Sequence, residues 1–167
     1  GLMSEACDYD LPFLARHCDV FYIGGTKVGA MFGEAVVFSG MKAPKYFFTN
    51  VKRHGALLAK GRMLGIQFDT LFTDNLYFKV SRHAIAMAER IRSIFRKHGI
   101  AIAYDSPTNQ QFVILSPTLY QALSRKVAFE IWERKSEAEI ICRFVTSWAT
   151  KEEELEELDT ILQNLLS

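Results

Sequence analysis

Several features are scarce in this sequence, and each scarcity excludes a class of protein. The 167 residues include only three cysteines, far apart and without a CxxC pair, namely Cys7, Cys18 and Cys142. This pattern argues against a disulfide framework or zinc site and favours reduced thiols in a protein core. Apolar runs stay short of the roughly 18 residues that a transmembrane helix needs, and a net charge of +1 leaves no basic excess for nucleic acid. We therefore expect a globular cytoplasmic protein that binds neither membrane nor nucleic acid.

Apolar residues, in contrast, are plentiful at 49% of the total, and one stretch arranges them around a turn. Residues 20–23 and 35–38 are short apolar runs with the composition and length of strands. Between the two runs lie Lys27 and four glycines, Gly24, Gly25, Gly29 and Gly33. Glycine permits sharp bends and close approach to a bound group because it has no Cβ. The stretch predicts two strands joined by a turn that presents a lysine to a cleft.

Lys27 has the setting of a Schiff-base lysine, which needs a fixed position and surroundings that favour the neutral, nucleophilic amine. On spacing alone, a solvated lysine in a glycine-rich turn remains the alternative interpretation. A phosphate-binding P-loop fits less well, because that motif has a glycine directly before the lysine and Thr26 occupies that position here.

Helix signals divide the first hundred residues. The run Asp10-Leu11-Pro12 predicts the start of a short helix that ends near residue 17, since proline is tolerated in a first turn. A cap at Thr49 or Asn50 predicts a second helix that runs to about residue 65. In that helix Arg53 and Lys60 would share a face. Apolar residues at three-four spacing predict a long amphipathic helix over residues 75–98, stopped by the glycine that follows it.

The remaining residues predict a small α+β layer. Residues 100–104, 112–115 and 139–145 have strand patterns. A cap and proline at 116–117 predict a helix whose apolar face continues through Leu119, Leu123, Val127 and Ile131. A capping box from Thr150 to Glu153 predicts the last helix.

A metal centre finds little support in these residues. Cys7, His17 and Cys18 lie close in sequence, but their neighbours are apolar and no fourth ligand is nearby. We interpret His83 and His98 as surface or helix-capping residues rather than ligands. We expect no metal site.

Arg143 interrupts the apolar strand predicted over residues 139–145. An unpaired buried guanidinium is costly, so Arg143 must reach solvent at an edge or meet an anion. A carboxylate matches the guanidinium as a two-pronged fork, so a substrate carboxylate is an apt partner. From the residues alone, a structural salt bridge is the competing interpretation.

Three segments, in chain order, resemble the threonine aldolase and β-eliminating lyase family of pyridoxal-phosphate (PLP) enzymes. Residues 19–38 are similar to the cofactor-lysine segment, in which a strand ends in Gly-Thr-Lys and an antiparallel strand of the Gly-Glu-Ala-Val-Val-Phe kind follows. Residues 52–62 and 141–148 continue the likeness. The three together cover most of the chain but match only the C-terminal half of the family, so we expect a piece of a longer enzyme.

The resemblance implies a fold and a set of roles. It implies an α/β fold: the C-terminal part of a PLP-transferase-like (aspartate aminotransferase-like) large domain over residues 1–75, then a small α+β domain over 76–167, connected by the long helix. Lys27 would bind PLP covalently, with Thr26 and Lys60 as further cofactor-binding residues. Lys60 would reach the cofactor phosphate, in its own or a partner subunit. Arg143 would hold the substrate carboxylate, and the family's shared sites imply a homodimer or homotetramer.

The implied reaction is retro-aldol cleavage of a β-hydroxy amino acid, threonine or allo-threonine, to glycine and an aldehyde. PLP-dependent β-elimination from an aromatic or sulfur amino acid is the alternative, because the same lysine and arginine serve both reactions. A non-catalytic domain that retains the fold is the alternative from a different class.

Overall fold

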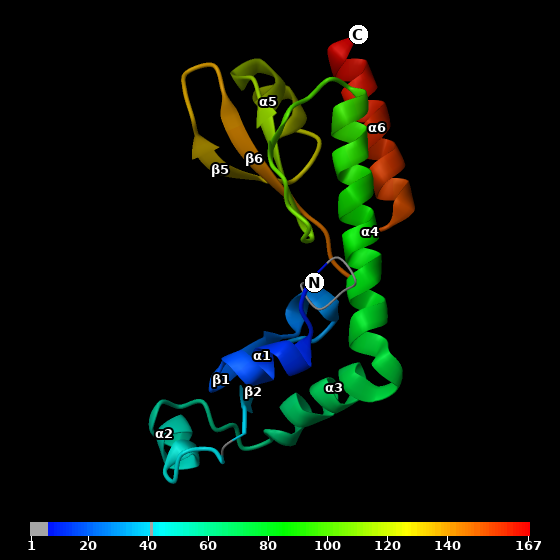
Figure 1. Ribbon diagram of the computed structural model, residues 1–167. Coiled ribbons are helices and arrows are strands. Elements are labelled where there is room, and N and C mark those ends of the chain that lie inside the picture. Colours follow the sequence, from blue (N-terminus) through cyan, green and yellow to red (C-terminus); the bar gives the residue numbers. More distant parts are fainter. Residues whose placement is uncertain (1–6, 41) are drawn as a thin grey trace.

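The computed structural model describes residues 7–40 and 42–167, arranged along one long helix, α4 (Leu76–Lys97) (Figure 1). A four-stranded sheet lies toward the C-terminal end of α4, and a two-stranded hairpin lies toward its N-terminal end. The predicted long helix over 75–98 is thereby confirmed. Because α4 supplies buried residues near both ends, it joins the two parts of the fold.

The sheet region comprises four strands and two helices. Strands β3 (Ile102–Tyr104), β4 (Gln110–Leu115), β6 (Ile140–Val145) and β5 (Glu130–Arg134) are ordered β3-β4-β6-β5, and all neighbours are antiparallel. α5 (Pro117–Leu123) and α6 (Glu152–Leu166) complete it. Alternate residues of β6, Cys142 and Phe144, enter a core with α4 and α6, so Arg143 between them lies on the opposite face.

The hairpin region is smaller. α1 (Leu11–His17) begins where the Asp10 carboxylate accepts a hydrogen bond from the backbone N–H of Phe13 at 2.7 Å, as predicted. β1 (Val20–Gly24) and β2 (Glu34–Phe38) pair antiparallel and are joined through a 3-10 turn, η1 (Thr26–Val28). One face of the hairpin packs against residues from α1, α3 and α4, in a cluster centred on Ile23, Val28, Ala30, Leu71 and Tyr77.

The predicted helix from residue 49 to about residue 65 is wrong. The chain forms α2 (Phe47–Arg53), an irregular turn, α3 (Arg62–Phe72) and the short turn η2 (Thr73–Asn75). Gly55 has a φ of +72°, in the left-handed region that a helix interior cannot contain. Lys60 therefore lies in the turn before α3 and shares no helical face with Arg53.

Two further predictions for the C-terminal half need correction. The helix that opens at Pro117 ends at Leu123, and Ile131 lies in β5, a strand that the apolar spacing concealed. The last helix is capped one residue later than predicted: the backbone N–H of Lys151 donates to the Glu154 carboxylate at 3.0 Å.

The cysteines and histidines follow the sequence interpretation in part. Cys142 is buried, but Cys7 and Cys18 are only partly covered, so they are not core residues. His98 follows α4 and contacts the Asp159 carboxylate at 2.6 Å, and His83 contacts the Thr150 carbonyl at 2.8 Å. Within residues 7–40 and 42–167, no three His, Cys, Asp or Glu side chains are grouped as metal ligands. No helix in these ranges has the length and apolar character to cross a lipid bilayer.

Candidate active site

The turn that carries Lys27 is fixed by its own backbone. The carbonyl of Gly25 accepts hydrogen bonds from the N–H groups of Val28, at 3.0 Å, and Ala30, at 2.9 Å. The side chains of Val28 and Ala30 are buried in the hairpin cluster. Lys27, directly before Val28, is exposed. The backbone that carries Lys27 is therefore fixed, as the sequence predicted, and the lysine amine is accessible.

A segment after β6 holds the same turn from the other side. The backbone N–H of Trp148 donates to the carbonyl of Lys27 at 3.1 Å. Gly29 has a φ of +101°, and a Cβ there would meet the Trp148 ring at 3.7 Å. Gly29 is needed for its conformation, because other residues rarely adopt this φ. Residues far apart in the chain thus meet at the lysine turn.

Thr146 ties this segment to the rest of the fold. Its side chain is 1% exposed and its hydroxyl donates to the Ala84 carbonyl of α4 at 2.6 Å. Its backbone N–H donates to the Asn109 carbonyl at 3.0 Å, and the Asn109 amide donates back to the Thr146 carbonyl at 2.7 Å. Sequence reasoning assigned no role to Thr146 or Asn109. The signal available in the sequence was the position of Thr146, a polar residue directly after an apolar strand.

Lys27 and Arg143 line the same cavity, which has a volume of about 320 Å³. The remaining lining is mostly apolar, with one carboxylate, and consists of Ala128, Phe129, Glu130 and Val145. Ligand pockets in proteins commonly combine apolar walls with a few convergent polar groups, at volumes from about 300 Å³ upward. The structure therefore brings the two residues selected from the sequence into one place.

Arg143 has partners on several sides. It forms an ion pair with Glu130, directly opposite on β5, and its Nη1 donates to Gln110 Oε1 at 3.0 Å. Its guanidinium carbon lies 5.3 Å from the centre of the Trp132 ring, within range of a cation–π contact. The salt bridge that competed with the substrate role in the sequence interpretation is therefore present in this structure.

Cys142 is next to Arg143 in sequence but does not belong to the cavity. It is fully buried on the core face of β6. Burial raises the pKa of its thiol to about 11, although nearby Arg134 acts in the opposite direction. The thiol stays protonated at neutral pH and is not a nucleophile, because reactivity requires the thiolate.

Two predicted cofactor residues lie outside this cavity. Thr26 is adjacent to Lys27 and exposed, and Lys60 is exposed in the turn before α3. Among the residues described, neither lines the cavity that Lys27 and Arg143 share. Their cofactor roles stay predictions.

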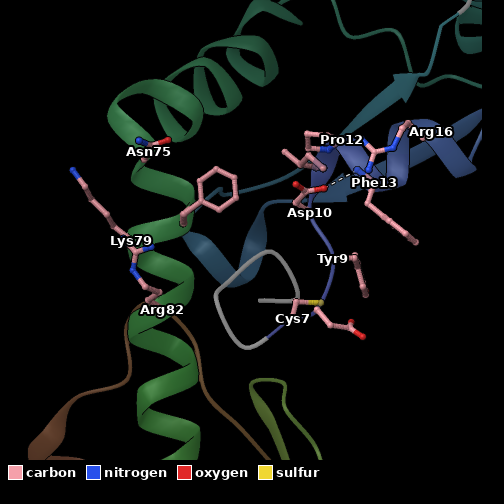
Figure 2. A pocket seen from close by; sticks show the side chains of 12 residues that line it. Cys7, Tyr9, Asp10, Pro12, Phe13, Arg16, Asn75, Lys79 and Arg82 are labelled. Atoms are coloured by element: carbon pink, nitrogen blue, oxygen red, sulfur yellow. Dashed lines mark hydrogen bonds between the residues drawn. The ribbon is translucent and has the colours of Figure 1, made fainter.

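A larger cavity, of about 810 Å³, lies between α1 and the first turns of α4. Figure 2 shows Phe13 and Arg16 on α1 and Lys79 and Arg82 on α4 around it. Lys27 and Arg143 are not part of its lining. We take the smaller cavity as the candidate active site, because a site is identified by its converging chemical groups and not by volume.

Comparison with known proteins finds chains of similar sequence and structure. No protein-family model matches the chain. The chain is 28% identical over 151 residues to the low-specificity L-threonine aldolase of Pseudomonas sp. (strain NCIMB 10558), covering 89% of this chain and 42% of that protein. Among solved structures, a threonine aldolase from Leishmania major superposes with a TM-score of 0.92 at 37% identity, over 99% of this chain and 48% of its own.

A more distant structure shares the fold alone. A structure of serine palmitoyltransferase with a PLP internal aldimine has a TM-score of 0.64 at 12% identity, over 95% of this chain and 42% of its own. The chain thus spans less than half the length of each of these three proteins. It has the fold of the C-terminal part of a fold-type-I PLP enzyme, and in sequence and structure it is similar to threonine aldolases.

Proposed function

We propose that this chain is part of a PLP-dependent carbon–carbon lyase that cleaves a β-hydroxy amino acid, threonine or allo-threonine, to glycine and an aldehyde. The names of the two threonine aldolases that it resembles support this reaction. Because the chain spans less than half of each, the activity is proposed for the longer protein that contains it.

The observation that carries the proposal is the shared cavity of Lys27 and Arg143. An exposed amine on a rigid turn can reach an aldehyde, and an arginine in the same cavity can hold a carboxylate. The residues present therefore fit a PLP site. PLP, when bound, supplies the electron sink for a carbanion at Cα, and the protein supplies orientation and charge.

Each residue has a separate task in this proposal. Lys27 would hold the cofactor covalently through its side-chain amine, which the amino group of the substrate would replace. Arg143 holds the substrate carboxylate, which fixes the rotation about the bond between Cα and the amino nitrogen. This orientation selects which bond to Cα breaks. Thr26, next to Lys27, and Lys60, in its own or a partner subunit, contact the cofactor. The protein assembles as a homodimer or homotetramer, and sedimentation of the full-length protein tests this oligomeric state. We place the protein in the cytoplasm.

The experiment that tests the proposal is borohydride reduction of the full-length protein with PLP, followed by peptide mapping. We expect the reduced cofactor on Lys27, and we expect its loss in Lys27→Ala. Lys135→Ala is the matched control, because Lys135 is paired with Glu139 in the β5–β6 turn, away from the cavity. A reduced adduct on another lysine would contradict the assignment.

Two further measurements separate the alternatives. Threonine turnover to glycine and acetaldehyde supports the lyase, whereas release of ammonia and a keto acid from an aromatic or sulfur amino acid supports β-elimination. The 167 residues alone should bind PLP only weakly, because they span less than half of each threonine aldolase that they resemble. Micromolar binding by these residues would show a more self-contained site.

A further inference from the structure

Glu130 contacts the arginine that is proposed to hold the substrate carboxylate. It faces Arg143 across the β5–β6 pairing, and both side chains line the candidate active-site cavity. The Arg143 side chain is 26% exposed and the Glu130 side chain is 67% exposed. The arginine is therefore largely enclosed, while most of the surface of its carboxylate partner faces solvent.

The guanidinium of Arg143 is only partly used by its present partners. Nη1 donates to the Gln110 amide oxygen at 3.0 Å, and Nη2 contacts one oxygen of Glu130. Nε is buried and has no hydrogen-bond partner among the described residues. Glu130 thus makes a single-point contact, and the two-pronged carboxylate fork that arginine offers is not formed.

A second carboxylate would compete with Glu130 for this group. A fork on arginine uses Nη2 together with either Nε or Nη1, so a substrate carboxylate would share Nη2 with Glu130. Two carboxylates on one nitrogen repel each other. Because Glu130 is mostly exposed, it can rotate into water at little cost, since exposed ion pairs are weak.

We propose that Glu130 is a specificity-determining gate residue, which occupies Arg143 when the cavity is empty and is displaced by the carboxylate of the substrate. This inference rests on the proposed substrate role of Arg143. Its consequence is selective: ligands with a carboxylate must displace Glu130 before they bind, whereas amines without a carboxylate need not.

A purely structural role for Glu130 predicts the opposite sign. If Glu130 served only to position Arg143, removing its charge would leave the guanidinium less ordered and would weaken carboxylate binding. If it is a gate, removing its charge frees Nη2 and strengthens carboxylate binding. The sign of the change therefore separates the two roles.

The test is titration of the PLP-loaded full-length protein with threonine and with isopropanolamine, which is threonine without its carboxylate. In Glu130→Gln we expect the apparent Kd for threonine to fall by about two- to fivefold, on the scale of one exposed ion pair. The Kd for isopropanolamine should stay unchanged. Glu133→Gln is the matched control, because Glu133 is on the same strand and contacts Tyr104.

An unchanged or increased Kd for threonine in Glu130→Gln overturns the gate. Glu130→Ala, which also removes the charge, must shift the Kd in the same direction as Glu130→Gln, and an opposite shift overturns the gate as well. Arg143→Lys separately tests the proposed substrate role of Arg143. If this variant binds threonine and isopropanolamine with equal losses of affinity, Arg143 does not hold the substrate carboxylate. Failure of the proposed function and failure of the gate thus give different results.

Discussion

The sheet region and the hairpin region, at opposite ends of α4, are stabilised differently. In the sheet region, large side chains are completely buried, among them Phe95, Leu115, Leu123 and Leu162. The hairpin cluster has five buried residues, each of which keeps some exposure. Around it, Tyr22 and Met31 are 70% and 72% exposed.

This difference shows where the candidate active site obtains its rigidity. Lys27 belongs to the hairpin region, whose own core is small, and Arg143 belongs to the sheet region. The two regions meet where the backbone N–H of Trp148, after β6, donates to the Lys27 carbonyl. Thr146 fastens the same segment to Ala84 of α4. The weaker region therefore carries the proposed covalent residue, and the stronger region holds it in place.

The largest effect should come from the core of the sheet region. Phe95 is 0% exposed and its ring lies 4.7 Å from that of Phe144. Phe95→Ala should lower the free energy of unfolding by about 3–5 kcal/mol, because it removes buried surface and leaves a cavity. Urea unfolding measures this. The comparison variant is Tyr22→Ala on the exposed hairpin face, with a change within about 0.5 kcal/mol. Equal losses in both variants would show that the two regions do not differ as described.

The second effect concerns function. Arg143→Lys keeps the charge but loses the guanidinium fork. The kcat/KM for threonine in the full-length protein should therefore fall, by a ratio that corresponds to a loss of about 2–4 kcal/mol of transition-state stabilisation. PLP binding, followed by absorbance, should survive. Joint loss of PLP and substrate binding, or unfolding, would identify Arg143 as a structural residue of the sheet region.

Thr146 tests the connection between the regions. Thr146→Val keeps the shape but removes the hydroxyl that donates to the carbonyl of Ala84. That carbonyl keeps its hydrogen bond within α4, so the free energy of unfolding should fall by about 0.5–1.5 kcal/mol. Hydrogen exchange of the Trp148 amide, which donates to Lys27, should become faster. Thr146→Ser retains the hydroxyl and serves as the control. Unchanged exchange in Thr146→Val would mean that the lysine turn is held independently.

The smallest effect should arise on the surface of the sheet region. Hydrogen bonds from Lys97 and then His98 hold the pKa of Asp159 below its ordinary value. A lowered folded-state pKa stabilises the protein above the unfolded-state value, near 4, and this contribution is lost as the pH falls through the folded-state pKa. Asp159→Asn should therefore cost about 1 kcal/mol or less at pH 7. Unfolding at several pH values should show the difference from the unmodified protein shrinking as the pH falls below about 4.

Sequence reasoning predicted the elements with strong internal patterns. Many residues of α4 and β6 are buried, so burial determined which positions of each element are apolar. This is why the three-four spacing of α4 and the apolar run of β6 could be recognised in the sequence. β5 was missed because all five of its residues are exposed, so no alternation of burial shaped its composition. The helix predicted to pass through Gly55 failed because a left-handed residue ends it, and φ cannot be inferred from a glycine's presence alone.

The candidate site divides in the same way. Lys27 and Arg143 stood out by their unusual settings, a cation in a glycine-rich turn and a cation inside an apolar strand, and the family resemblance supplied their roles. Their common cavity could not be predicted, because it depends on contacts between distant segments. The Glu130 partner was hidden for a further reason: β5 was not predicted, so Glu130 was not expected opposite Arg143. The division into domains at residue 75 stays a prediction.

The hydrogen bond between Trp148 and Lys27 also affects how the site is made during protein synthesis. A ribosome adds about 5–20 residues per second, so many seconds separate the appearance of these two residues. During that interval the lysine turn has left the ribosome without the segment that later secures it. A nascent chain that stops before Trp148 would contain both proposed reactive residues, Lys27 and Arg143, yet lack the contact that fastens the lysine turn. Cofactor attachment should therefore follow the synthesis of Trp148.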